Sequence, residues 1–513
     1  MQKEISRREA LKLGALGVGA GVLGASNLMA MPLDAKDVKF DEEYDVVIIG
    51  SGFGALAAGI TSAERGLKVL LVEKMGRLGG NSVINGGIFA VPNNEAQKKE
   101  GIKDSNELFL KDCLKAGLQI NHTELLETIA NRAKDVFALT VKCGAKYVEK
   151  LSHAGGHSVP RTYQTANGSG SGIVLPMIEY IEKNPNVVIK KRTKFDDFVL
   201  DNDGKVVGIS VREGYKFDSK LKDDDRENKS GERKFFKAKR GVVLASGGFC
   251  RDIFFRQLQD PRLGKDVDST NHPGATAGGL IAALNIGACP VQVSWLQYGP
   301  WACPDEVGFG VGSMFNVNGS FRYGISVDPR TGKRYMNELA DRKTRADAMF
   351  KVIDAKKDIY PINFCDSQCI PSLLSSHFEK PLKAGILKEF KTLDELAAHY
   401  KIPADELKKT VEKYNAGVKA GKDEFGKPVE TTGGIDISKP PFYAERGVPK
   451  LHHTMGGVKI NTKAQVISIN TKKPIPGLYA AGEVTGGTHG ASRLGSVAIT
   501  DCLTFGMIAG ENI

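Results

Sequence analysis

The chain has 513 residues, of which 41% are hydrophobic and 7% aromatic, and its formal net charge is +11. This length predicts two or three domains with ample core, and the composition is typical of a soluble globular protein. The basic excess suits an anionic small molecule or an acidic partner, whereas no Lys/Arg block interleaved with aromatic residues predicts nucleic-acid binding.

Residues 1–30 resemble a twin-arginine export signal. Arg7 and Arg8 lie in the segment Ser6–Lys12, and the apolar run LGALGVGAGVLGA follows it. This run is shorter than the roughly 20 residues that span a bilayer, and cleavage is expected near Ala30. We therefore expect a periplasmic protein without stable membrane insertion. A retained N-terminal anchor helix is the alternative.

The cysteines are scattered, and they form neither a C-x-x-C-H haem-attachment motif nor a paired C-x-x-C zinc motif. No metal site is therefore predicted. Cys365 and Cys369 are spaced either for a disulfide or for free thiols one helical turn apart. A chain without covalent haem of its own needs a separate partner that supplies any electrons it uses.

The first elements after the signal predict a βαβ unit. A strand over 44–49 runs into the turn that contains Gly50, Gly52, Gly54 and Ala55, a helix follows, and a strand over 68–72 ends at Glu73. Glycines permit the tight turn and a close approach of the backbone to a pyrophosphate, and the helix N-terminus offers free N–H groups. Glu73 is placed for ribose hydroxyls. The unit indicates a Rossmann-like dinucleotide-binding domain.

Several later segments resemble the fumarate reductase/succinate dehydrogenase flavoprotein family. They are the loop 74–87, with Lys74, Gly80, Asn81, Ser82, Gly86 and Gly87, and the segments GGHSVPRT (155–162), GVVLASGGF (241–249), NHPGATAGG (271–279) and AAGEVTGG (480–487). The resemblance implies FAD, with further contacts from Gly247, Gly482, Glu483, Arg493 and Ser496. Loop 74–87 lacks the histidine to which membrane-bound members attach FAD, so noncovalent FAD is expected. The nearest group is the soluble periplasmic flavocytochrome-type reductases.

This resemblance implies an α/β fold, a Rossmann-like FAD-binding domain with an inserted α+β capping domain. The expected parts are 40–290 for the first stretch of the FAD-binding domain, 291–438 for the cap and 439–513 for the return to the FAD-binding domain. Residues 212–240 are dense in both charges, which predicts a solvated hairpin; a docking surface for an electron donor is the alternative. In the cap, 392–418 predicts amphipathic helices joined at Ile402-Pro403.

Reduction of an activated C=C bond requires a hydride, a proton and cations that bind the carboxylate. The resemblance implies that FAD N5 supplies the hydride and that Arg342, which follows the segment Gly332–Glu338, supplies the proton. Arginine is a weak acid at neutral pH, so this role requires a buried site crowded with cations. The alternative is a structural ion pair between Arg342 and Asp341 or Glu338.

Binding of the substrate carboxylate carries over from the family to His453, in HHTMGG, and to Arg493, in HGASRLG. An arginine holds a carboxylate through two parallel hydrogen bonds. His452 is the alternative if the register differs by one residue.

The second carboxylate site of fumarate reductases is not matched. Gly299 stands where those enzymes have a histidine, and the segment Phe315–Ser320 lacks their acid and their arginine. A tyrosine at position 298 is a feature in which the sequence resembles urocanate reductase. In that enzyme an aromatic residue faces the end of the substrate that has no carboxylate. Tyr298 is therefore predicted to contact the substrate.

These departures predict a reductase of a small enoate with one carboxylate, such as urocanate, a cinnamate or an acrylate, served by a separate c-type cytochrome. Fumarate reductase proper is the second interpretation. A ketosteroid-type FAD dehydrogenase and an electron-transfer flavoprotein without a substrate site are the others. The proton relay is open, with Arg322, Arg345 and Asp341 as candidates.

Overall fold

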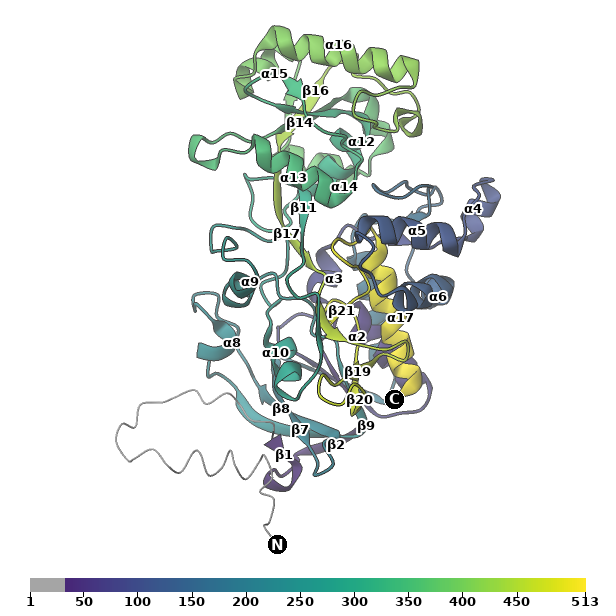
Figure 1. The fold of residues 1–513 in the computed structure, drawn as a ribbon, viewed down its shortest axis with the longest axis vertical. Coiled ribbons are helices and arrows are strands. Elements are labelled where there is room, and N and C mark those ends of the chain that lie inside the picture. Colours follow the sequence, from purple (N-terminus) through teal and green to yellow (C-terminus); the bar gives the residue numbers. More distant parts are fainter. Residues whose placement is uncertain (1–32) are drawn as a thin grey trace, which may run out of the picture. The chain divides into compact units, whose positions relative to one another are not determined.

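A computed structural model describes residues 33–513, and the segment predicted as an export signal lies outside these residues (Figure 1). The largest sheet has the order β1-β7-β8-β9-β2-β3-β6, with β20 on β9 and β19 on β20. Its strands are β1 (Leu33–Asp34), β2 (Glu42–Ile49), β3 (Val69–Glu73), β6 (Val187–Lys191), β7 (Thr193–Leu200), β8 (Val206–Glu213), β9 (Glu232–Leu244), β19 (Gln465–Ile467) and β20 (Pro474–Ala480).

The predicted βαβ unit is confirmed at the centre of this sheet. Strands β2 and β3 pair in parallel, and α2 (Phe53–Glu64) connects them. Residues 69–73 of β3 are buried throughout, as expected for a parallel strand covered on both faces. The sheet and its covering helices form the FAD-binding domain.

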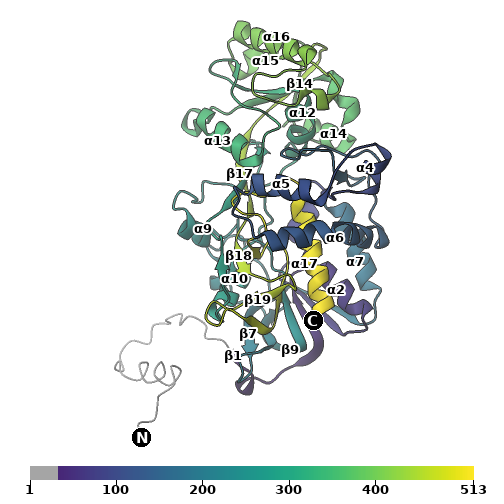
Figure 2. The ribbon, with the colours of Figure 1, turned by 45° about the vertical axis from the view of Figure 1, so that its right-hand side comes forward.

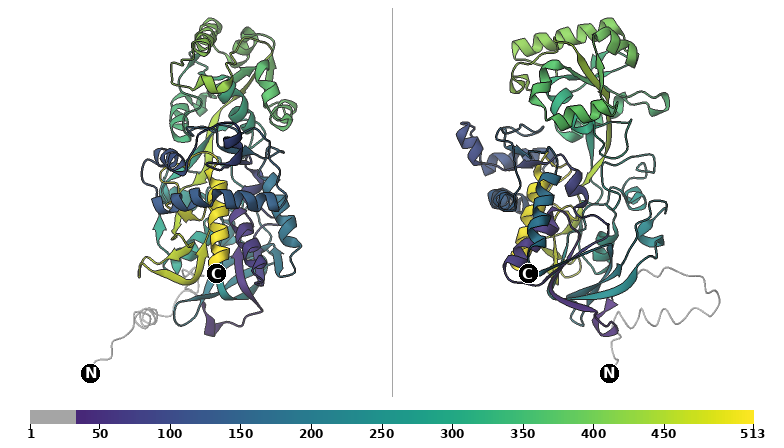
Figure 3. Two further views of the ribbon diagram at one scale, coloured as in Figure 1. Left: turned by 90° about the vertical axis from the view of Figure 1, so that its right-hand side faces the viewer. Right: turned by 180° about the vertical axis from the view of Figure 1, so that it is seen from behind.

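Helix α17 (Val497–Asn512) packs against α2 at the end of the chain, as Figures 2 and 3 show from several sides. The backbones meet at glycines: a Cβ on Gly506 would lie 2.3 Å from the carbonyl oxygen of Gly54. Gly506 therefore permits the close packing of α17 on the start of α2, and the C-terminal segment shares one core with the sheet.

The other helices and short strands of this domain surround the sheet. They are α3 (Gly80–Ile84), α4 (Glu95–Lys99), α5 (Asn106–Ala116), α6 (Thr123–Lys142), α7 (Ser171–Glu182), α8 (Asp224–Glu227), α9 (Ile253–Gln259), α10 (Gly278–Asn285), β4 (Ile88–Ala90), β5 (Thr162–Gln164), β10 (Pro290–Val291), β18 (Gly457–Lys459) and β21 (Thr485–Gly486). None of the helices in residues 33–513 is long and apolar enough to cross a membrane.

The cap contains a sheet of order β13-β12-β14-β16-β15, covered by α15 and α16 (Figure 1). Its elements are α11 (Ser313–Phe315), α12 (Phe321–Tyr323), β12 (Ile325–Asp328), β13 (Lys333–Arg334), α13 (Arg342–Val352), β14 (Ile362–Asp366), α14 (Ser375–Lys383), β15 (Lys388–Phe390), α15 (Leu393–Tyr400), α16 (Ala404–Ala420) and β16 (Phe442–Arg446). A π-helical segment, Asn316–Ser320, joins α11 to α12. The helices predicted over 392–418 are confirmed as α15 and α16.

The predicted end of the cap at residue 438 is too early. Strand β16 pairs with β14 and β15 and completes the cap sheet, so the chain leaves the cap only after Arg446. It returns along β17 (Val448–Thr454), which pairs antiparallel with β11 (Leu296–Ala302). This two-stranded ladder carries the chain between the FAD-binding domain and the cap.

Two local predictions gain detail from the structure. The hairpin predicted over 212–240 is formed by β8 and β9, but α8 in its connection turns Asp224 and Asp225 inward. Cys365 and Cys369 are free thiols with sulfurs 3.2 Å apart. They lie on β14 and on the following 3₁₀ segment, Ser367–Ser372, rather than on one helix.

Candidate active site

A cavity at the carboxyl ends of β2 and β3 fits the predicted adenosine half of FAD. Glu73 lines it, and the Oε2 atom of Glu73 accepts a hydrogen bond from Ser51 Oγ at 2.5 Å. Burial raises the pKa of Glu73. Lys74 also lines the cavity, with its ammonium 3.1 Å from Asp225 of the charged hairpin. Asp225 was not predicted at this site.

The turn before α2 requires glycine at residue 50. Gly50 has φ +104°, and a Cβ there would lie 2.3 Å from the carbonyl oxygen of Ala245. The N-cap residue of α2 is Gly52, which has no side chain to accept a hydrogen bond from the helix. Ser82 Oγ accepts one from the Phe53 N–H at 3.0 Å. The Ser246 hydroxyl lines the cavity, buried and without a partner among the described residues. These free polar groups fit a dinucleotide.

A larger cavity begins at loop 74–87 and extends to the cap. Its polar lining combines residues far apart in the chain: Asn81, Ser82, His153, Arg322, Arg342, Arg345, His452, His453, Glu483, Arg493 and Ser496. Its apolar lining includes Phe53, Trp301, Phe309, Met314 and Val317. Loop 74–87, the ladder of β11 and β17, the cap and the C-terminal segment thus all contribute side chains to one cavity.

His453 and Arg493 lie together in this cavity, as predicted for carboxylate binding. His453 is on β17, and its Nδ1 atom is 3.2 Å from Glu483 Oε2. His453 Nε2 and Arg493 Nε are buried and have no partner among the described residues. Burial and the neighbouring arginines hold the pKa of His453 well below its usual range, so the imidazole is neutral. Both side chains therefore retain hydrogen-bonding capacity for a ligand.

Glu483, which was predicted to contact FAD, also contacts two residues of β17. Its Oε1 atom accepts from the Thr454 N–H at 2.9 Å, which leaves Oε2 toward His453. Burial raises the pKa of Glu483 to about 7. The protonation of this carboxyl therefore determines which nitrogen of His453 carries the proton near neutral pH.

Arg342 is the first residue of α13, and Asp341 is the N-cap that accepts from the Thr344 N–H. The Arg342 Nη1 atom donates to Gln297 Oε1 at 2.9 Å, and its guanidinium carbon is 4.4 Å from the centre of the Trp301 ring. No ion pair formed by residues 33–513 includes Arg342, so the alternative of a structural pair with Asp341 or Glu338 is wrong.

The electrostatic surroundings of Arg342 favour loss of its proton. Burial, and then the positive charges of Arg493 and Arg345, hold the pKa of Arg342 well below its usual range. Burial likewise lowers the pKa of Arg493 to about 10. This cation-crowded site is the environment that an arginine acid requires.

Comparison with known proteins identifies the family. A model described as FAD binding domain matches residues 45–499. The chain is 44% identical to the acrylate reductase flavoprotein subunit of Shewanella woodyi, over 98% of this chain and 97% of that protein. It is 34% identical to fumarate reductase (cytochrome) of Shewanella frigidimarina, over 92% and 77% of the two chains. The chain belongs to the fumarate reductase/succinate dehydrogenase flavoprotein family.

Other relatives agree with this assignment. Urocanate reductase of Eggerthella lenta is 33% identical over 92% of this chain and 74% of that protein. The open conformation of a flavocytochrome c3 fumarate reductase superposes with a TM-score of 0.71 at 30% identity, over 93% and 79% of the two chains. The cofactor of this flavoprotein is FAD, and the protein is an oxidoreductase of the type that acts on C=C bonds.

Some of the predicted cofactor residues line one of the two cavities, and the others line neither. Gly50, Glu73 and Lys74 line the adenosine cavity, and Asn81, Ser82, Gly86, Glu483, Arg493 and Ser496 line the larger one. Gly52, Gly54, Ala55, Gly80, Gly87, Gly247 and Gly482 line neither cavity. Gly87, for example, lies where a Cβ would be 2.2 Å from Thr165 Oγ1, so this glycine serves loop packing.

Tyr298 does not reach the cavity, contrary to its predicted role as a substrate contact. The register of β11 on β17 shifts between Gln297 and Tyr298, and Tyr298 packs edge-to-face on Phe350, with the ring centres 4.9 Å apart. Trp301 lines the cavity instead. Neither Gln297 nor Trp301 was predicted as a site residue, although both lie in the segment that resembles fumarate reductases.

The candidates for the proton relay lie in different positions. Arg322 and Arg345 line the cavity, and Arg345 Nη1 donates to the carbonyl oxygen of Glu338 at 3.3 Å. Asp341 does not line it and serves as a helix cap. The arrangement therefore leaves the two arginines as relay candidates.

Proposed function

We propose that this flavoprotein reduces the C=C bond of a small α,β-unsaturated monocarboxylate of the acrylate type. The observation that carries the proposal is the cavity in which the free polar atoms of His453 and Arg493 lie with Arg342 and with the indole of Trp301. The 44% identity to an acrylate reductase flavoprotein subunit supports the same substrate class.

Carboxylate binding and proton donation are assigned to different side chains. Noncovalently bound FAD supplies hydride chemistry, in agreement with the lack of histidine in loop 74–87. Arg493 and His453 hold the substrate carboxylate and orient the double bond. Arg342 donates a proton to the carbon that does not receive hydride, and its hydrogen bond to Gln297 fixes the guanidinium for this transfer.

Fumarate is the second candidate substrate, and a specific observation favours it. Arg322 and Arg345 also line the cavity, and a second carboxylate requires such cations. Against fumarate, Gly299 and Phe315–Ser320 offer no histidine, acid or arginine at the positions that fumarate reductases use. Trp301 adds apolar surface where a charged group costs free energy.

The electron donor and the cellular location are also proposals. A separate c-type cytochrome is supported by the absence of a haem-attachment motif in the chain and by the relative described as fumarate reductase (cytochrome), of which this chain covers 77%. Export to the periplasm is supported by the twin-arginine-like segment at Arg7 and Arg8.

A panel of acceptors tests the substrate proposal. The FAD-loaded protein is assayed anaerobically with reduced viologen and with acrylate, methacrylate, fumarate, urocanate or cinnamate. The proposal requires the highest kcat/KM with acrylate or methacrylate. Arg322→Gln and Arg345→Gln variants separate the alternatives, because loss of fumarate turnover alone assigns these arginines to a second carboxylate. A highest kcat/KM with fumarate contradicts the proposal.

A further inference from the structure

The indole of Trp301 occupies space that a side chain at residue 299 would otherwise need. A Cβ on Gly299 would lie 3.1 Å and 3.2 Å from two atoms of the indole, Cζ2 and Cε2, and 3.4 Å from the Cβ of His452. Contacts of 3.1–3.2 Å are tight, so a Cβ at residue 299 would push the indole by a few tenths of an ångström. Gly299 therefore leaves the indole its present position against the cavity.

Trp301 has the contacts of a wall of the cavity rather than only of a core residue. It is 4% exposed, lines the cavity, and packs edge-to-face on His452 with ring centres 5.1 Å apart. Its other side joins an apolar cluster in the cap with Phe321, Met336 and Met349. The cap core thus holds the indole in place, and the indole cannot swing away from the cavity without leaving this cluster.

The polar atom of Trp301 is unused. The indole Nε1 is buried and has no hydrogen-bond partner among the described residues. A buried tryptophan N–H normally has a partner, so this one is available to a ligand or to an ordered water in the cavity. The face of the same ring carries the Arg342 guanidinium at 4.4 Å.

The position of Trp301 along the ladder determines which part of a substrate it meets. Gln297 is opposite His453 in the register of β11 and β17. The indole of Trp301 turns back along β11 to Gly299 and packs on His452, the neighbour of His453, while Arg342 lies over its face. A substrate held by His453 and Arg493 therefore lies beside the indole, which limits the group at its other end.

From this geometry we infer that Trp301 is the specificity-determining residue of the cavity. This inference deepens the proposed function and rests on it. The indole closes the far end of the cavity, so that enoates with hydrogen or methyl at that end fit, whereas a ring or a second carboxylate does not. A ring is excluded by volume, and a carboxylate is excluded because it would be desolvated against an aromatic surface.

Substitutions at both positions test the inference in the FAD-loaded protein. Trp301→Ala should raise the kcat/KM ratio of cinnamate to acrylate by about tenfold or more, because the pocket gains the volume of an indole. Trp301→Phe should give an intermediate ratio. Gly299→Ala should lower kcat/KM for acrylate by about tenfold, because the displaced indole moves into the cavity, and the double variant Gly299→Ala/Trp301→Ala should recover the loss.

A binding measurement adds a readout independent of turnover. The chain has two tryptophans, and the other, Trp295, is 38% exposed and does not line the cavity. In Trp295→Phe, with unchanged selectivity, the fluorescence of Trp301 should change on titration with propionate. The absorbance of bound FAD verifies folding of each variant.

The outcomes distinguish the two proposals. No turnover of any enoate by the FAD-loaded wild type contradicts the proposed function itself. Turnover of acrylate with the same cinnamate-to-acrylate ratio in wild type, Trp301→Phe and Trp301→Ala overturns the inference and leaves the proposed function standing. A loss in Gly299→Ala that the second substitution does not recover also overturns it, because the indole is then not the group displaced.

Discussion

Replacement of Arg342 by glutamine tests the assignment of the proton donor. Glutamine retains a hydrogen-bond donor for Gln297 and loses both the cation and the transferable proton. The hydrogen bond to Gln297 at 2.9 Å and the stack on Trp301 at 4.4 Å exist before substrate binds, so their loss affects mainly orientation. Loss of a general acid costs about 10²–10⁴ in rate, or about 3–5 kcal/mol of transition-state stabilisation.

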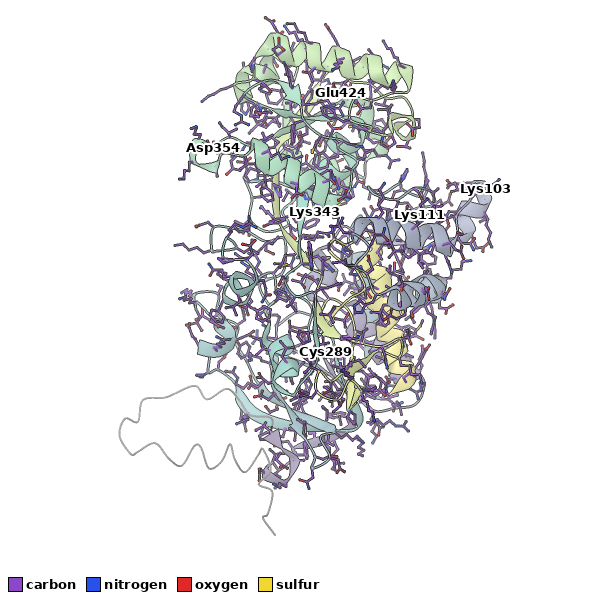
Figure 4. The ribbon with its side chains drawn as sticks, in the orientation of Figure 1. Lys103, Lys111, Cys289, Lys343, Asp354 and Glu424 are labelled. Carbon is purple, nitrogen blue, oxygen red and sulfur yellow. The ribbon has the colours of Figure 1, made fainter. Side chains whose placement is uncertain are left out.

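We therefore expect Arg342→Gln to lower kcat for acrylate by about 10²–10⁴ while the Kd of propionate rises by less than about tenfold. The first quantity is measured anaerobically with reduced viologen, and the second by the shift in flavin absorbance on titration. Lys343→Gln is the matched control, since Lys343, labelled in Figure 4, is the next residue of α13. Its exposed ammonium pairs with Asp347 at 2.6 Å.

The control should retain wild-type kcat. If Arg342→Gln binds FAD normally and keeps kcat within about tenfold of wild type, Arg342 is not the acid.

Three further predictions concern the carboxylate site and the cap. Arg493→Lys should raise both KM for acrylate and the Kd of propionate by about 30–100-fold with a smaller change in kcat, because one of two parallel charge-assisted hydrogen bonds is lost; a change confined to kcat would contradict a binding role. KM of the wild type should rise above about pH 7, where Glu483 ionises, because His453 Nδ1 then keeps the proton and Nε2 no longer donates to the substrate carboxylate. In Glu483→Gln the amide donates to Nδ1 at every pH, so KM should be flat from pH 6 to pH 8.5, and a retained rise would refute the coupling. Glu338→Gln should lower the free energy of unfolding by about 3–5 kcal/mol, because Glu338 is fully buried and holds Arg334 at 2.7 Å. Urea titration measures this loss, and Glu406→Gln at the surface should show no shift of the midpoint.

The elements with local signals were predictable. The βαβ unit, the helices over 392–418 and the charged hairpin each follow from patterns of apolar residues, turns and charges within a few tens of residues. The cap boundary was not predictable in this way. The boundary at 438 was taken from the family resemblance, whereas the hydrogen bonds of β16 to β14 and β15 keep residues 442–446 in the cap sheet.

The site residues show the same division. Glu73, His453, Arg493 and Arg342 lie in segments with recognisable motifs, and the structure brings the last three into one cavity. Tyr298 was assigned by analogy with urocanate reductase. The register of β11 shifts between Gln297 and Tyr298 and again between Gly299 and Ala302, so a simple alternation of side chains does not predict that Trp301 rather than Tyr298 lines the cavity.

Contacts between residues far apart in the sequence could not be predicted. The approach of Asp225 to Lys74 depends on a turn of the charged hairpin that has no sequence signature. The glycine at 299 was interpreted only as the loss of a histidine. Its second consequence, space for an indole two residues later, requires the positions of both side chains.

Single-turnover oxidation of the reduced flavin needs no electron donor and therefore isolates the preference of this protein for acrylate over fumarate. The FAD-loaded protein is reduced, freed of reductant and mixed anaerobically with acrylate or with fumarate, while flavin absorbance and the organic product are followed. We expect acrylate to reoxidise the flavin at least about tenfold faster than fumarate and to yield propionate. Faster reoxidation by fumarate, with formation of succinate, would refute the assignment as an acrylate-type reductase.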